Sequence, residues 1–171
     1  MKNSLEMILQ KGDIIQVKGK DWISNAIKIL TNSEYAHTAM YMGDETLIES
    51  NFEKGVCKVP LTKYNEFDVY RHVAITPIKQ KEVCDWAETK IGYKYDFLGI
   101  FGIFLSMLKN RKSNPFDDKD SYWCSELVSD AYINNGIFMC VDSQTWTVTP
   151  NDLAVCDGFK KIFSYSKNLT P

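Results

Sequence analysis

The stretch around Cys124 contains the side chain of this sequence best suited to nucleophilic chemistry. Apolar residues recur at helical spacing after it until Asn135-Gly136, and they are Leu127, Val128, Ala131 and Tyr132. The pattern predicts that Cys124 lies in a first helical turn, with Ser121 or Asp120 as the N-cap. The positive end of the helix dipole would favour the thiolate, which is the nucleophilic form. The alternative is a small, unreactive buried cysteine, and this stretch alone does not decide between the two.

A thiol nucleophile needs an imidazole to accept its proton and a third group to orient the ring. His37 is the candidate base, and it lies in a predicted strand, Tyr35–Asp44. The strand leads into a turn and returns as a hairpin partner at Thr46–Ser50. Glu49 in this second strand is the candidate to orient the ring.

The hairpin register decides whether Glu49 can reach His37. If Met42 pairs with Thr46, Glu49 lies diagonal to the histidine, within reach of a long side chain. If Met42 pairs with Leu47 instead, the glutamate points to the other face of the sheet. The sequence leaves both registers open.

Other catalytic chemistries find little support in the sequence. No HExxH motif occurs, and the two histidines lie far apart among scattered cysteines, so no metal site is expected. The GxSxG motif of serine hydrolases is absent as well. His72, beside Arg71 near a strand end, is expected to be structural. Cysteine chemistry without a cofactor is the remaining enzymatic option.

The rest of the chain is predicted to form the elements that position these two stretches. Further strands are expected at Ile14–Val17, Val56–Val59, Phe67–His72 and Phe159–Tyr165. Helices are expected at 22–30, from Pro77 to Gly92 with Thr76 as N-cap, and at the capped segment Val148–Leu153. The apolar run Phe97–Leu108 is too short to span a membrane and is predicted to be a buried helix or a segment that touches lipid. A polar loop is expected at Lys109–Lys119.

Length and composition limit the classes of protein to consider. The chain has 171 residues, which predicts a single domain over residues 1–171. With 20 basic and 22 acidic residues, its formal net charge of -2 gives no indication of nucleic-acid binding. Five cysteines without a CxxC pair argue against a disulfide framework and favour a reducing compartment. The apolar run before Lys11 is too short for a secretory signal, so a cytoplasmic location is expected.

Short motifs follow one another in a fixed order, and they are Gly12–Ile15, Tyr35–Gly43, Leu47–Glu49, Tyr95–Phe97 and Tyr122–Val128. In this order the chain resembles the permuted branch of the NlpC/P60 superfamily. That branch includes the YiiX-like cysteine peptidases and, more distantly, the lecithin retinol acyltransferase relatives. The histidine precedes the cysteine, which reverses the ordinary arrangement. The resemblance implies an α+β, papain-like fold in which an antiparallel sheet packs against the helix that carries the cysteine.

Carried over by position, the resemblance implies that Cys124 is the nucleophile, His37 the general base and Glu49 the residue that orients the imidazole. The chain departs from the family at Ala36–Ala39, where relatives often have Ser-His-Val-Gly, and this affects the pocket beside the histidine. The backbone N–H of Cys124 is the expected oxyanion donor. Tyr35 is a candidate wall of the site or second oxyanion donor.

The resemblance implies hydrolysis of amide bonds in peptidoglycan-type peptides or small amides, through a thioester acyl-enzyme. Two alternatives remain open. One is a lipid-directed thiol acyltransferase or esterase, in which Phe97–Leu108 would line an acyl pocket or enter a membrane surface. The other is a catalytically silent binding module of the same fold. The sequence does not indicate the oligomeric state.

Overall fold

The computed structural model describes residues 7–19, 28, 33–96, 120–139 and 145–167. Its main sheet is antiparallel and has the strand order β4-β3-β2-β1-β5-β8. The strands of this sheet are β1 (Ile14–Val17), β2 (His37–Gly43), β3 (Thr46–Asn51), β4 (Gly55–Pro60), β5 (Glu66–His72) and β8 (Phe159–Ser166). A short parallel pair is formed by β6 (Lys94–Tyr95) and β7 (Ser121–Tyr122).

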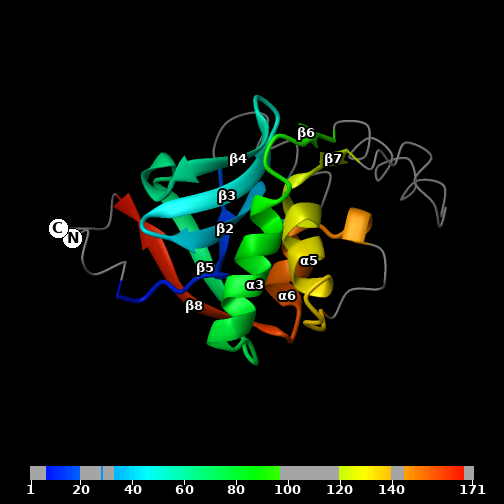
Figure 1. Ribbon diagram of the computed structural model, residues 1–171. Helices are drawn as coiled ribbons and strands as arrows, with labels where there is room; N and C mark the ends of the chain where they lie inside the picture. The colour runs from blue at the N-terminus through cyan, green and yellow to red at the C-terminus, as the bar shows by residue number, and fades with distance from the viewer. Residues whose placement is uncertain (1–6, 20–27, 29–32, 97–119, 140–144, 168–171) are drawn as a thin grey trace, which may run out of the picture.

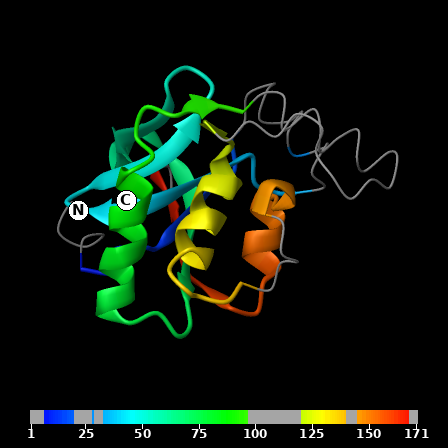
Figure 2. The same ribbon diagram turned by 45° about the vertical axis from the view of Figure 1, so that its right-hand side comes forward.

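Helices cover one face of this sheet. They are α3 (Pro77–Glu88), α5 (Cys124–Ile133) and α6 (Pro150–Val155). The described residues also form two short 3-10 helices, η1 (Leu61–Lys63) and η2 (Thr145–Thr147). Figures 1 and 2 show α3, α5 and α6 side by side on the same side of the strands. This is the α+β arrangement, with an antiparallel sheet packed against the cysteine helix, that the sequence predicts.

The apolar stripe of α5 is buried against the sheet, as its helical spacing indicates. Leu127, Val128, Ala131 and Tyr132 are fully buried. They share a core cluster with strand residues such as Met40 and with Val83 of α3. The hydroxyl of Tyr132 also donates a hydrogen bond to the carbonyl of Gly12, just before β1. Burial of this stripe therefore fixes α5 against the centre of the sheet.

The opposite face of the sheet is apolar as well. Alternate strand residues point to it, and they form a second cluster that includes Ile15, Ala39, Leu47 and Phe67. Leu61 of η1 belongs to this cluster, and Phe163 and Tyr165 of β8 pack against it. Because both faces are covered, all four residues of the central strand β1 are buried.

Away from its turn, the β2–β3 hairpin follows the first of the two registers considered from the sequence, because Met40 pairs with Ile48 and Tyr41 with Leu47. At the turn the register shifts, and Thr46 pairs with Gly43 and not with Met42. Asp44 and Glu45 adopt positive φ angles of 49° and 54°, as in the tight turns that join antiparallel strands. In this register Glu49 lies opposite Ala39 and diagonal to the first residue of β2.

Local signals predicted most of the described elements. All the expected strands are present, and the side chain of Thr76 accepts the backbone N–H of Lys79 at the start of α3. The predicted end of α3 at Gly92 is wrong, because the helix ends at Glu88. Beyond it the chain forms i to i+3 turns, such as that from Tyr93 N–H to the Lys90 carbonyl.

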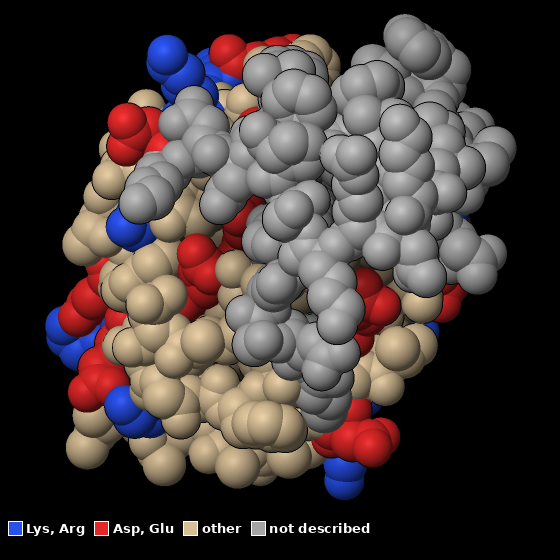
Figure 3. All heavy atoms as spheres, turned by 90° about the vertical axis from the view of Figure 1, so that its right-hand side faces the viewer, with Lys and Arg blue, Asp and Glu red and all other residues tan. Residues whose placement is uncertain are grey.

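Several expectations fall outside the described residues. These are the helix at 22–30 apart from residue 28, the apolar run Phe97–Leu108 and the loop Lys109–Lys119. Within the described ranges, no helix combines the length and the hydropathy needed to cross a membrane. On the face in Figure 3, the described acidic and basic side chains are scattered and form no continuous basic patch.

Candidate active site

Cys124 is the first residue of α5, so the prediction that it lies in the first helical turn is confirmed. The predicted N-cap at Ser121 or Asp120 is wrong, because the cap is Trp123 with extended backbone angles. Residues 121 and 122 instead form β7 and pair with β6, which delays the start of the helix. The carboxylate of Glu126 accepts the Trp123 backbone N–H at 3.3 Å, as in half of a capping box.

The segment before Cys124 is held from the sheet side. The carbonyl of Tyr122 accepts hydrogen bonds from the Ser50 hydroxyl at 2.6 Å and from the Asp96 N–H at 3.1 Å. On the other side, the Ser125 hydroxyl donates to the Val148 carbonyl at 2.6 Å. These contacts fix the position from which α5 begins, and therefore the position of the Cys124 sulfur.

His37 is the first residue of β2, and its side chain remains 18% exposed. Its Nε2 lies 3.2 Å from Oε2 of Glu49, as the hairpin register allows. The ring also packs beside Tyr64, with 5.9 Å between the ring centroids. Only one of the two hairpin registers considered from the sequence would bring His37 and Glu49 together. In the structure the two side chains are in hydrogen-bond contact.

The side chain of Glu49 is fully buried, yet both oxygens of its carboxylate accept hydrogen bonds from other side chains. Oε1 accepts hydrogen bonds from Asn51 Nδ2 at 2.8 Å and from Lys63 Nζ. Oε2 accepts one from the Tyr64 hydroxyl at 2.5 Å in addition to its contact with His37. Burial alone would raise the pKa of this carboxyl, but the hydrogen bonds and charges of these donors hold it well below its usual value. Glu49 is therefore an anion at neutral pH.

The thiol of Cys124 is buried, and the His37 side chain acts on it through charge and hydrogen bonding. Burial raises the pKa of this thiol, but the charge and hydrogen bond of His37 more than offset that effect. The backbone N–H groups of Thr38 and Ser125 also bond the sulfur, and the net result is a lowered pKa. Burial lowers the pKa of His37, whereas the Cys124 thiolate and then Glu49 raise it to about 10. This arrangement favours a thiolate–imidazolium pair.

Known proteins resemble this chain in sequence and in fold. A family model described as "Permuted papain-like amidase enzyme, YaeF/YiiX, C92 family" matches residues 8–163. The chain belongs to this family. The YiiX-like resemblance of the sequence motifs is thereby confirmed, and the family description supports a cysteine hydrolase of the amidase or peptidase type.

Two relatives from Escherichia coli extend the comparison. The probable lipoprotein peptidase YaeF of strain K12 is 24% identical over 173 residues, which cover 85% of this chain and 62% of YaeF. The chain thus spans only about three fifths of that relative's length. The crystal structure of the metalloprotein YiiX from strain O157:H7 matches with a TM-score of 0.70 and 19% identity, over 93% of this chain and 99% of that one. This similarity shows that the fold is the same.

Other residues of this permuted papain-like domain lie differently from the expected site. Tyr35 is fully buried, and its hydroxyl donates to Asp68 at 2.6 Å and lies 2.9 Å from that of Tyr70. This geometry gives no support to Tyr35 as a wall or oxyanion donor. His72 is buried, with Nε2 3.1 Å from the Phe138 carbonyl, as a structural histidine would be. Within the described ranges, no group of three or more His, Cys, Asp or Glu could hold a metal ion.

Sequence reasoning missed the residues that surround Glu49 and the sulfur. Asn51, Lys63 and Tyr64 come from the end of β3 and from η1, and no motif marks them. Tyr95 of β6 packs against the cluster of Trp123 and Cys124, although in the sequence analysis it is only one residue of a motif. No sequence periodicity links Glu49 to η1, because strand β4 lies between them in the chain. Only tertiary packing brings η1 next to Glu49.

Proposed function

We propose that this protein is a cysteine amidase that cleaves amide bonds through a thioester acyl-enzyme. The observation that carries the proposal is the position of the buried Cys124 thiol at the first residue of α5, beside His37, whose charge and hydrogen bonding lower the pKa of the thiol. The second support is the contact of His37 Nε2 with Glu49, which leaves Nδ1 as the ring nitrogen available to the sulfur. This is the linear arrangement of nucleophile, base and orienting group that thiol hydrolases use.

In the first half of the reaction, His37 takes the proton of Cys124 and the thiolate attacks the amide carbonyl carbon. A carbon–sulfur bond forms, and the carbonyl oxygen becomes an oxyanion. The N–H of Cys124 has no acceptor inside the helix because it belongs to the first turn, so it can donate to this oxygen. The imidazolium then protonates the leaving nitrogen, and the carbon–nitrogen bond breaks.

In the second half, His37 removes a proton from water, and the hydroxide attacks the thioester. The carbon–sulfur bond breaks, the product leaves as a carboxylic acid, and Cys124 is ready for another cycle. Glu49 keeps one ring orientation throughout and stabilises the imidazolium, because it is a buried anion in contact with Nε2.

For the substrate, we propose peptides or small amides, including peptidoglycan-type peptides. The name of YaeF, a probable lipoprotein peptidase, supports a peptide amide over an ester. Peptide amides and micellar esters should therefore be assayed side by side with wild type and Cys124→Ser. Turnover of micellar ester alone would replace the amidase proposal with a lipid-directed esterase. Turnover of neither, together with an ordinary thiol at Cys124, would indicate a binding module.

The first test is the pH dependence of Cys124 alkylation by iodoacetamide, with the modified residue identified by mass spectrometry. We expect rapid alkylation below the pH at which a free thiol ionises, because His37 lowers the pKa of Cys124. The variant His37→Ala should lose this low-pH reactivity. Cys84 is an internal control, because burial raises its pKa to about 11. An ordinary thiol profile for Cys124 in both proteins would rule the mechanism out.

A further inference from the structure

We infer that Lys63 and Tyr64 are positioning residues that act through Glu49. They fix the orientation of its carboxylate and reduce the negative charge that acts on the His37 ring. This inference rests on the proposed thiol mechanism and adds a second layer to it. Its basis is the division of donors over the carboxylate, with Lys63 on Oε1 and Tyr64 on Oε2. We call these two residues and their contacts with Glu49 the η1 clamp.

The η1 clamp is built on a fixed turn. Leu61 is buried in the cluster on the far face of the sheet, and its N–H donates to the Glu45 carbonyl at 2.7 Å. The N–H of Tyr64 closes the turn on the Leu61 carbonyl at 3.3 Å. The side chains of Lys63 and Tyr64 therefore come from a backbone that is anchored to the hairpin carrying Glu49. An anchored turn loses less conformational entropy when it holds a carboxylate than a free loop would.

Each oxygen of Glu49 has two donors, and this determines what the clamp does. On Oε2 the Tyr64 hydroxyl occupies one direction, so His37 Nε2 is restricted to the other. On Oε1 the ammonium of Lys63 offsets part of the negative charge that would otherwise act fully on the imidazole. Asn51 shares Oε1, and it also donates to Cys57 on the neighbouring strand β4.

The sign of the clamp's effect follows from the charges that face the site. Glu49 faces His37, Lys63, Tyr64 and, on the neighbouring strand β4, Cys57, while Cys124 faces His37, Tyr95 and Tyr64. Removal of the Lys63 cation leaves a net negative change beside the pair. Protons then bind more tightly to both Cys124 and His37, so both titrations move to higher pH. Removal of the Tyr64 hydroxyl acts in the same direction, because Oε2 becomes a stronger acceptor.

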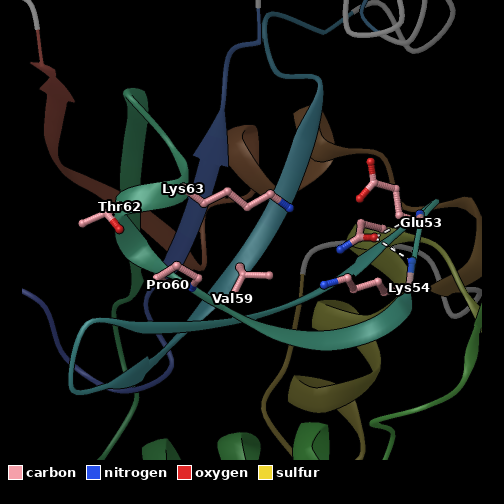
Figure 4. A pocket seen from close by; sticks show the side chains of 7 residues that line it. Glu53, Lys54, Val59, Pro60, Thr62 and Lys63 are labelled. Carbon is pink, nitrogen blue, oxygen red and sulfur yellow. Dashed lines mark hydrogen bonds between the residues drawn. The ribbon is translucent and has the colours of Figure 1, made fainter.

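A pocket beside the clamp provides a matched control. It has a volume of about 360 Å³ and is lined by residues that include Lys54 and Lys63. The ammonium ends of these two lysines point toward one another across it (Figure 4). Of these two lysines, only Lys63 is a hydrogen-bond partner of Glu49 in the described part of the chain. Lys54→Met therefore removes the same charge from the same pocket without touching the carboxylate.

The experiment measures the pH profile of Cys124 alkylation in wild type, Lys63→Met, Tyr64→Phe and Lys54→Met. We expect both clamp variants to shift the midpoint upward by about 0.5–1 pH unit. Lys54→Met should move it by no more than about 0.2 unit, because a more distant, solvent-screened charge acts weakly. Lys63→Arg should restore most of the wild-type midpoint. Thermal unfolding of each variant separates a folding defect from a change in titration.

The inference is overturned if folded Lys63→Met and Tyr64→Phe keep the wild-type midpoint, or if Lys54→Met shifts it equally. A downward shift would also overturn it, since the sign would be wrong. Failure of the underlying mechanism looks different, because the wild-type protein itself would then show an ordinary thiol midpoint.

Discussion

Replacement of Glu49 by glutamine is the sharpest probe of how the site and the fold depend on each other. The change keeps the size and shape of the side chain but turns one acceptor oxygen into an NH2 group. Each oxygen accepts two hydrogen bonds, from Asn51 and Lys63 on one side and from Tyr64 and His37 on the other. In either orientation of the glutamine amide, its NH2 group therefore faces two hydrogen-bond donors and no acceptor.

The magnitude follows from these contacts. A hydrogen bond to a charged group contributes about 1.5–3 kcal/mol. The carboxylate is 0% exposed, but Lys63 is 38% exposed and its share is reduced by solvent. We expect Glu49→Gln to lower the free energy of unfolding by about 2–4 kcal/mol, out of a total of about 5–15 kcal/mol for a domain of ordinary stability. Loss of this anion is a net positive change beside the Cys124–His37 pair, so both titrations should move to lower pH, opposite to the shift expected for Lys63→Met.

Urea unfolding at pH 7 measures the first effect and iodoacetamide alkylation at pH 6 measures the second. Glu53→Gln is the matched control, because Glu53 lines the neighbouring pocket but belongs to an exposed turn. Its stability should stay within about 0.5 kcal/mol of wild type. A Glu49→Gln protein as stable as this control, with an unchanged alkylation rate, would refute the description of Glu49 as a buried, functionally coupled anion.

Two further predictions concern the backbone and the pH range. A Cβ added at Gly55 would lie 2.0 Å from the Tyr93 carbonyl oxygen, whereas at Gly92 it would meet nothing within 4 Å. Both glycines have positive φ, so calorimetry should show Gly55→Ala to be destabilised more than Gly92→Ala; equal losses would leave only the strain of positive φ. Stability in urea should be greatest between about pH 4.5 and 6.5. Glu49, held ionised by His37 and its other donors, loses its contribution as pH falls below 4.5, the ordinary pKa of a glutamate. His37 loses its own as pH rises from its ordinary pKa of 6.5 toward 10, so a flat profile would contradict both shifts.

Local patterns in the sequence were sufficient for much of this fold. The helical spacing after Cys124 predicted its place in the first turn, and Thr76 before a proline predicted the start of α3. Both depend on interactions within a few residues. The predicted N-cap of α5 is wrong, because β7 exists only through pairing with β6, far away in the sequence. A local capping rule cannot account for a strand partner that distant.

The candidate site shows the same division between local and tertiary information. His37 and Glu49 were identified by residue type and strand position, but their contact required a register that the sequence left open. Lys63 and Tyr64 could not be found, because they reach Glu49 through tertiary packing of η1. Tyr35 adjoins β2 in sequence, yet its hydroxyl is used by Asp68 of β5. Adjacency along the chain is therefore a poor guide to which side chains meet at this site.

The burial of Glu49 also has an evolutionary consequence. Loss of the Cys124 thiol, for example by exchange for serine, changes one atom and leaves the core nearly intact. Loss of the Glu49 carboxylate leaves several hydrogen-bond donors inside the protein without their acceptor. Selection for folding therefore retains the carboxylate even without selection for catalysis. Inactive descendants of such a chain should therefore lose the cysteine first and keep the glutamate long afterwards. In this fold a retained glutamate would not by itself be evidence of a working enzyme.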